Sequence, residues 1–261
     1  MFSVVMPTLQ RSSLLIPLLG LYCESPAVSE IVVINNSREA IPFDHQKVRF
    51  IQPRKNIFVN PAWNLGVANA TSDYLVISND DVLFDIRILP ALVNVLGRRT
   101  GIVGPDRSCF VEVTEFDSPR GADPIPEPSV EPVSYRPYGF GTLMFMRRAN
   151  FTPIPEDMKI WCGDDWLFRH QRGINYRLTG IAIASKMGST SRQPQFSDRK
   201  KADIRRYREA YAENPYLARF EGRTARQQHL ATVRAAARRA RRRIAGAKRH
   251  VARLGRTAAD V

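Results

Sequence analysis

Two clusters of acidic residues in this sequence have the side chains that chemistry at a phosphate or a hydroxyl group requires. Asn79-Asp80-Asp81 follows the apolar run "YLVIS", and Asp164-Asp165 lies within "WCGDDWLF". Neighbouring carboxylates repel each other and are costly to desolvate unless a cation or a hydrogen-bond donor meets them. Each cluster also has a simple structural explanation. The first fits a strand that ends in a polar turn, and the second fits acids that stabilise a helix start.

The elements that must position these clusters alternate along the first half of the chain. β-Rich apolar runs predict strands at "FSVVMP", "EIVVINNS", "VRFIQ", "YLVIS" and "GIVG". Helical patterns between them predict helices at "SSLLIPLLGLY", "NPAWNLGVANA" and residues 86–97. This alternation predicts an α/β fold with a mostly parallel, doubly wound sheet.

Polar residues follow three of the predicted strands: Pro7-Thr8, Asn35-Asn36-Ser37 and Asn79-Asp80-Asp81. If the strands are parallel, their carboxyl ends open onto one edge of the sheet, where ligands bind in such folds. One polar strand end is a turn, whereas three that converge indicate a site.

The second half of the chain has a different pattern. Residues 112–138 hold six prolines and six acids, which favours a mobile loop that acts as a lid or acceptor contact, or else a plain surface insertion. "GFGTLMFMRR" predicts a strand whose glycines allow close backbone approach. "WCGDDWLFRHQRG" predicts a helix that stops at Gly173, and "YRLTGIAIASKMGSTS" predicts one further strand.

The charge of the chain is concentrated at its C-terminal end. Residues 223–261 hold 12 of the 39 Lys and Arg residues and one of the 25 acids, which is +11 of the net +14. Three widely spaced cysteines, no long apolar run and no leader-like N-terminus predict a cytoplasmic protein with reduced thiols.

In that C-terminal stretch, apolar residues alternate in steps of three and four and Arg fills the other positions, which predicts a heptad-patterned helical tail. Three interpretations fit it: a solvated helix that packs on its own domain or on a partner, a helix on an anionic membrane surface that would place the protein peripherally at the inner membrane face, or a helix that binds nucleic acid. Nucleic acid fits least well, because no aromatic side chain is interleaved for base stacking.

The ordered set of motifs resembles the GT-A-fold glycosyltransferases of family 2, which use nucleotide-sugar donors and invert the anomeric centre. The matching segments span roughly residues 2–192 and include "VVMPTLQR", "EIVVINNS", "SDYLVISNDDVLF", "GDDWLFRHQRG" and "KMGSTS". The resemblance implies a GT-A-like, Rossmann-like domain over 1–198. A helical connection over 199–222 and the basic tail over 223–261 would follow it.

The resemblance also implies roles on the donor side. Asn79-Asp80-Asp81 stands where the family has its Asp-x-Asp motif, with Asp81 as ligand of a Mn²⁺ or Mg²⁺ ion at the donor diphosphate. The residues implied to contact the donor are Pro7, Thr8, Arg11, Asn35, Asn64, Asn79, Asp80 and Lys186. Lys186 replaces a metal-binding His of the family, and an ammonium pairs with phosphate but cannot ligate a metal.

On the acceptor side, Asp164-Asp165 matches the family motif that supplies the catalytic base. We expect Asp165 to be the base, with Asp164 as the alternative, and a glycan, lipid or protein as acceptor. Trp161 and Trp166 flank the pair and fit either sugar stacking or core packing. The function expected is sugar transfer from a nucleoside-diphosphate sugar to a hydroxyl. The alternative is a non-catalytic protein of the same fold whose tail holds a membrane or nucleic acid.

Overall fold

The computed structural model describes residues 1–116, 123–185 and 196–212. Lys186 and the predicted tail over 223–261 lie outside the described residues. The helices are α1 (Leu15–Glu24), α2 (Val59–Ala68), α3 (Leu89–Val95), α4 (Gly163–Arg169) and α5 (Ser197–Ala212). Short 3-10 turns include η1 (Ile86–Ile88), η3 (Val113–Glu115) and η4 (Phe140–Thr142).

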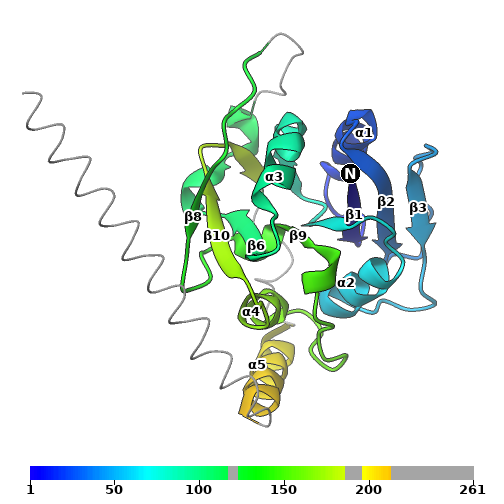
Figure 1. Cartoon of the computed structure of the whole chain (residues 1–261). Helices are drawn as coiled ribbons and strands as arrows, with labels where there is room; N and C mark the ends of the chain where they lie inside the picture. The colour runs from blue at the N-terminus through cyan, green and yellow to red at the C-terminus, as the bar shows by residue number, and fades with distance from the viewer. Residues whose placement is uncertain (117–122, 186–195, 213–261) are drawn as a thin grey trace, which may run out of the picture.

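An eight-stranded sheet forms the centre of the described structure (Figure 1). Its strand order is β3 (Val48–Ile51), β2 (Val28–Asn35), β1 (Phe2–Thr8), β4 (Tyr74–Ser78), β9 (Leu143–Arg147), β6 (Thr100–Pro105), β10 (Ile174–Thr179) and β8 (Ser129–Pro132). Strands β3, β2, β1 and β4 are parallel to one another, and β6 is parallel to β10. Strand β9 runs antiparallel to both β4 and β6, and β8 runs antiparallel to β10.

A second, three-stranded sheet has the order β5 (Val82–Phe84), β11 (Ile183–Ser185) and β7 (Phe110–Val111). The single strand predicted over "YRLTGIAIASKMGSTS" is therefore wrong. Gly180, at a φ of 81°, turns the chain between β10 and β11, and these strands belong to different sheets. A left-handed backbone at this position suits glycine, which has no Cβ to clash.

Other predicted elements differ at their ends. The helix expected over 86–97 is a 3-10 turn followed by α3, and α4 ends at Arg169 rather than at Gly173. The segment 112–138, expected as a loop, contributes the edge strand β8, which pairs with β10. The predicted boundary at residue 198 falls inside α5 and stays a prediction.

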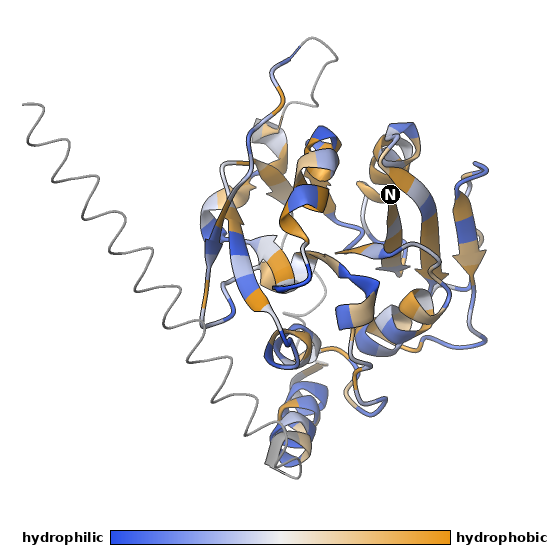
Figure 2. Cartoon of the chain, viewed as in Figure 1, coloured by the Kyte–Doolittle hydropathy of each residue, from blue (hydrophilic) through white to orange (hydrophobic). Residues whose placement is uncertain are grey.

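The core lies on both faces of the large sheet because side chains alternate along each central strand. Val4 and Met6 of β1 face α1, whereas Val5 faces Trp63 of α2. Figure 2 shows hydrophobic residues concentrated in the central strands, with helices of mixed hydropathy around them. Helices α1 and α3 cover one face, and α2 and α4 cover the other (Figure 1).

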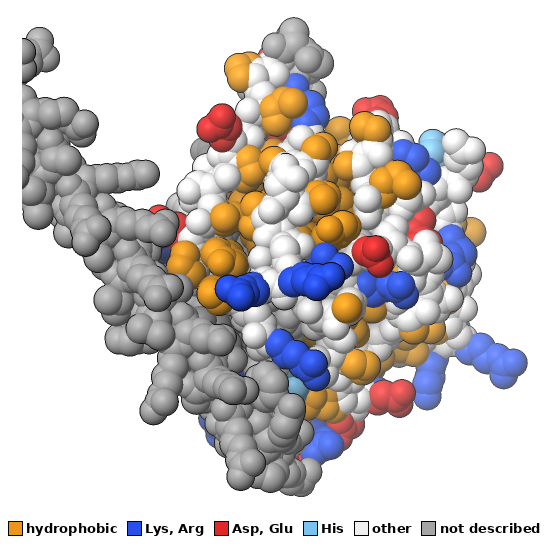
Figure 3. All heavy atoms as spheres, viewed as in Figure 1, with side chains coloured by type: hydrophobic (Ala, Val, Ile, Leu, Met, Phe, Trp, Pro, Cys, Tyr) orange, Lys and Arg blue, Asp and Glu red, His pale blue; other side chains and the backbone are white. Residues whose placement is uncertain are grey.

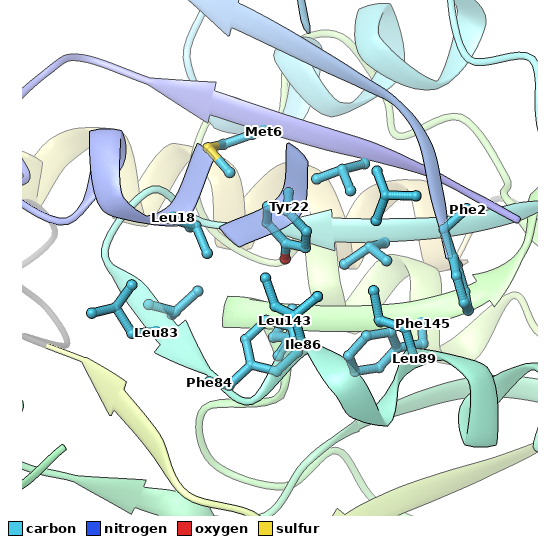
Figure 4. Packing of buried hydrophobic residues seen from close by; sticks show 14 of the residues in the cluster. Phe2, Met6, Leu18, Tyr22, Leu83, Phe84, Ile86, Leu89, Leu143 and Phe145 are labelled. Atoms are coloured by element: carbon cyan, nitrogen blue, oxygen red, sulfur yellow. The ribbon is translucent and has the colours of Figure 1, made fainter. Parts of the chain in front are cut away.

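The face under α1 is centred on aromatic packing (Figure 4). The rings of Tyr22 and Phe84 meet edge to face with centroids 6.1 Å apart, and Phe84 meets Phe145 in the same manner at 6.2 Å. All three side chains are fully buried. This packing joins α1 to β5 and β9, so the small sheet is attached to the large one through the core.

Basic side chains gather on one face of the domain (Figure 3). Figure 3 shows basic side chains across the lower part of the face viewed, below a region with more hydrophobic ones.

Cys23 and Cys109 are buried, Cys162 is half-buried, and all three are free thiols. Among the helices of the described ranges, none is long and apolar enough to cross a membrane.

Two glycines in helices give a matched test of this packing. A Cβ on Gly66 of α2 would lie 2.3 Å from Cγ1 of the buried Val5, whereas a Cβ on Gly20 of α1 would meet nothing within 4 Å. We expect Gly66→Ala to lower the free energy of unfolding by about 1–3 kcal/mol, because the stiff Val side chain cannot move aside. Gly20→Ala should raise it by up to about 1 kcal/mol, since Ala is the better helix former.

Urea denaturation of the two variants and the wild type measures both effects. Equal stabilities of the Gly66 and Gly20 variants would contradict the close contact between α2 and β1.

Candidate active site

The three polar strand ends come together as the sequence predicted. β2, β1 and β4 are adjacent and parallel, and the register places Thr8 opposite Asn35. The Thr8 hydroxyl donates to Oδ2 of Asp80 at 2.5 Å, and the Asn36 amide N–H donates to the Thr8 carbonyl at 2.8 Å. The three segments therefore form one polar edge of the sheet.

Gln10 is a residue of this edge that the sequence analysis missed. Its amide nitrogen Nε2 donates to Oδ1 of Asn35 at 3.1 Å and to the Glu39 carbonyl at 2.7 Å. Its backbone N–H donates to the Thr8 hydroxyl at 2.8 Å, and its φ of 57° is unusual for a residue other than Gly. Gln10 thus ties the loop after β1 to the loop after β2.

Three predicted donor contacts occupy different environments along this edge. Pro7 is buried in β1 beside β2. Both ends of the Asn35 amide serve the 35–39 turn, since it donates to the Glu39 carbonyl at 2.7 Å and accepts from the Ser37 N–H at 3.0 Å. Arg11 is exposed, and no hydrogen-bond or ion-pair partner reaches it within the described residues. Of the three, Arg11 has the side chain most available to a ligand.

Asn64, a further predicted donor contact, lies on α2 and holds another loop. Its Nδ2 donates to the Ile154 carbonyl at 2.7 Å, and its Oδ1 accepts from the Ile154 N–H at 2.9 Å. This reciprocal pair fixes the segment before α4 and accounts for the polar side chain. The donor contact stays a prediction.

Asp80 and Asp81, the two acids after β4, differ in the hydrogen bonds that their carboxylates accept. The Thr8 hydroxyl bond opposes the effect of burial, which raises the pKa of the Asp80 carboxyl. Burial and the neighbouring Asp80 charge raise the pKa of Asp81 to about 6. Oδ1 of Asp81 is buried and accepts no hydrogen bond from any described residue. Such an atom is costly unless a ligand meets it.

The orphaned oxygen of Asp81 fits a divalent cation. Within the described residues no group of three or more His, Cys, Asp or Glu side chains could hold a metal. Mg²⁺ in phosphate chemistry, however, is often held by only one or two carboxylates, with substrate phosphates and waters completing its shell. The donor set on this edge therefore suits an ion that arrives with a diphosphate and does not suit a resident structural metal.

The second acid cluster begins α4, after Cys162 in a left-handed conformation with φ 63°. Arg136 bridges it: Nε donates to Oδ1 of Asp165 at 2.6 Å, and a terminal nitrogen lies 3.0 Å from Oδ2 of Asp164. Burial and the Asp165 charge raise the pKa of Asp164, and Arg136 opposes both. No donor among the described residues reaches Oδ2 of Asp165.

Arg136 is a second residue of the site that the sequence did not predict, and it belongs to the segment expected to be a loop. It lies between Tyr135 and Pro137, both turn-compatible, and no local pattern marks it.

The two tryptophans beside the acids have separate roles. Trp166 is core, with its indole N–H donating to the Pro153 carbonyl at 3.0 Å, and Trp161 is half-buried against Phe196.

One short segment, η4, joins the two acid clusters. The Asn79 N–H donates to the Thr142 carbonyl at 2.9 Å, and a Cβ on Gly141 would lie 2.6 Å from Oδ2 of Asp164. Neighbouring Cα atoms are about 3.8 Å apart, so η4 contacts both acid clusters and brings them close together. The arrangement can hold a cation or a polyanion at the cluster after β4 and accept a proton from a hydroxyl at the cluster on α4.

The sequence model of glycosyl transferase family 2 matches residues 3–154 of the chain. The match includes the polar edge and Asp81 but ends before Asp164-Asp165. No curated protein sequence matches the chain.

Solved structures share the fold at low sequence identity. A mannosyltransferase from Pyrobaculum calidifontis, solved with GDP-Man and Mn²⁺, is 14% identical with a TM-score of 0.55. The match covers 90% of this chain and 75% of the mannosyltransferase chain. TarS from S. aureus is 15% identical with a TM-score of 0.51 and covers 70% of this chain. The match covers 60% of that TarS chain, and TarS has also been solved with UDP-GlcNAc. These likenesses establish the GT-A fold.

The ion pairs of Arg136 predict a pH-dependent effect on stability. Arg136→Met leaves Asp164 and Asp165 without their cation, so we expect the free energy of unfolding at pH 7 to fall by about 1–3 kcal/mol. Acid protonates the two carboxylates and removes the charge that the arginine compensates, so the deficit should shrink toward about pH 4. Urea denaturation of both proteins at several pH values measures it. A deficit independent of pH would show that Arg136 stabilises the fold by packing alone.

Proposed function

Because the chain belongs to glycosyl transferase family 2, we propose that it is an inverting glycosyltransferase that moves a sugar from a nucleoside-diphosphate sugar to an acceptor hydroxyl. The observation that carries this proposal is the contact of both acid clusters with η4, one cluster having an orphaned oxygen and the other bridged by an arginine. Sugar transfer requires these two functions side by side.

The donor would bind at the polar edge formed by β1, β2 and β4. Carboxyl ends of parallel strands are where nucleotides bind in open α/β sheets. The exposed Arg11 lies at this edge and can pair with phosphate, and Thr8 and Gln10 hold the loops that would surround the nucleotide. Asn79 and Asp80 border the same edge, and Lys186 remains a predicted phosphate partner.

Asp81 would hold the divalent metal. A Mg²⁺ or Mn²⁺ ion bound there with the donor would neutralise charge that develops on the departing diphosphate. The chain itself contributes an uncompensated carboxylate at a fixed position at the end of β4.

Asp165 would act as the base. In a single displacement, the acceptor oxygen forms a bond to the anomeric carbon as the bond to the diphosphate oxygen breaks. The acceptor proton passes to the carboxylate, and the nucleoside diphosphate leaves with the bonding electrons. Because Arg136 occupies Oδ1 of Asp165, the open Oδ2 is the atom that would take the proton. Asp164, which is more enclosed and lies against Gly141, would keep Arg136 in place.

The acceptor class is a hydroxyl on a glycan, lipid or protein. The chain would work in the cytoplasm, with residues 223–261 available for a membrane surface or a partner helix. The second candidate function, binding of a donor without transfer, is favoured by the ion pair that engages Asp165.

Exchange of the two acids of α4 for their amides separates the base from its neighbour. We expect Asp165→Asn to lower the turnover number roughly 10²-fold or more while donor binding is retained, because an amide cannot accept the proton. Asp164→Asn should cost less, since the base is intact. Transfer from a nucleotide sugar and calorimetric titration of the nucleotide supply the two readouts.

Asp106→Asn is the matched control, because that carboxylate also pairs with an arginine, Arg177, and belongs to neither acid cluster. If all three variants keep full transfer, the protein has another base. If the wild type binds donor and transfers nothing, the binding-only function is correct.

Replacement of the uncompensated carboxylate should separate stability from activity. We expect Asp81→Asn to fold with at least wild-type stability, because it removes a largely buried charge whose Oδ1 accepts no hydrogen bond from any described residue, and to lose nucleotide-sugar turnover. EDTA should weaken nucleotide binding by the wild type and have no effect on the variant. Thermal unfolding with and without nucleotide and Mn²⁺ measures both. An Asp81→Asn protein with normal turnover would remove Asp81 from the donor site.

A further inference from the structure

A buried carboxylate on α5 contacts the segment 159–161, which lies just before the second acid cluster. Asp203 is fully buried, and its two oxygens accept hydrogen bonds from three consecutive backbone N–H groups. Oδ1 accepts from Lys159 at 3.1 Å, and Oδ2 accepts from Ile160 at 2.8 Å and from Trp161 at 3.1 Å. Buried carboxylates are tolerated where N–H donors surround them, so this contact is specific.

Helix α5 is docked on the surrounding structure by further contacts around Asp203. Nε of Arg206 lies 2.6 Å from Oδ2 of Asp157, and Arg199 stacks over the Phe58 ring at 5.6 Å. Tyr207 and Ala210 pack against the core cluster that contains the buried residues of α4. Asp203 is thus held in place by one turn of helix on either side.

The opposite side of the segment 159–161 is held by α2. The Asn60 N–H donates to the Lys159 carbonyl at 3.0 Å, and Nδ2 of Asn60 donates to the Trp161 carbonyl at 3.2 Å. Asn60 is fully buried, and a Cβ on Gly163 would lie 2.1 Å from its Oδ1. The segment is therefore fixed through its carbonyls by α2 and through its N–H groups by α5.

This segment leads directly into the residues that carry the second acid cluster. Trp161 is followed by Cys162 at φ 63°, and α4 starts at Gly163, one residue before Asp164-Asp165. A non-glycine residue holds a left-handed conformation only where its surroundings enforce it. The direction of α4 therefore depends on the anchors of 159–161.

We propose that Asp203 is a positioning residue for the catalytic carboxylates: its three hydrogen bonds fix the turn at Cys162 and hold Asp165 in line with Arg136 and the acceptor. The catalytic part of this inference rests on the proposed function. Segment 159–161 and α5 both lie beyond residues 3–154, so these hydrogen bonds belong to the part of the chain that the family model does not match.

Asp203→Asn in the full-length chain tests the proposal, since it keeps the shape and removes one of the two accepting oxygens. We expect the amide hydrogens of 159–161 to exchange roughly 10-fold faster or more. The Trp166 amide, which donates to the Cys162 carbonyl at 2.8 Å in the first turn of α4, should follow them, and the amides of β1 should not change.

In transfer assays the same variant should lose roughly 10-fold or more in turnover number, with the donor KM within about twofold, because misplacement of a base slows the chemical step without affecting donor contacts. Asp198→Asn, the same change at an exposed position of α5, is the control for charge. Ala210→Gly, which weakens α5 without touching the three amides, is the control for stability.

Each result either supports the proposal or contradicts it. Unchanged exchange at 159–161 and at Trp166 overturns the anchor, and faster exchange with an unchanged turnover number overturns the positioning role. A turnover loss equal to that of Ala210→Gly also overturns that role, because the effect would then be general stability. If the wild type turns over no donor, the proposed function fails separately, and exchange at Trp166 decides whether Asp203 positions α4.

Discussion

Negative charge held below the surface is the constraint around which this end of the molecule is arranged. A carboxylate removed from water needs a cation, several N–H donors or a proton. Four such carboxylates are stabilised here by three kinds of partner. A threonine hydroxyl meets Asp80, Arg136 meets Asp164 and Asp165, and three backbone N–H groups meet Asp203. Asp81 is the exception within the described residues, since its Oδ1 is buried and accepts nothing. The exception is where an external cation fits.

The sheet makes this arrangement possible by bringing distant residues to one edge. Three parallel strands with alternating buried side chains end together, so their polar residues meet without any sequence proximity. Strand β9 then runs antiparallel beside β4 and begins at the same edge, immediately after η4. Its direction is what places Thr142 against Asn79 and Gly141 against Asp164. A parallel β9 would begin at the opposite edge and leave the two acid clusters unconnected.

The sequence predicted the parts of the site that depend on local pattern. Each strand end is a short apolar run followed by polar residues, and the fold class follows from the order of such runs. The residues that it missed depend on partners far along the chain. Gln10 meets Asn35, Arg136 meets Asp165, and Asp203 meets Trp161 from 42 residues away. The division of 174–185 into two strands was missed although Gly180 lies between them, because a glycine inside an apolar pattern does not by itself show whether the backbone turns.

The limits of the family match divide the site into two halves. Residues 3–154 contain the polar edge, Asp81 and η4, which together form the proposed donor half. Asp164-Asp165 and the α5 anchor lie beyond those residues, while Arg136 reaches across from the segment before η4. A nucleotide diphosphate presents the same chemistry in every donor, and the strand ends that would receive it are part of the family pattern. An acceptor differs from one enzyme to the next, so the residues that recognise it need not follow that pattern. The ion pairs of Arg136 and the three hydrogen bonds of Asp203 therefore belong to the half in which we expect acceptor choice to be encoded.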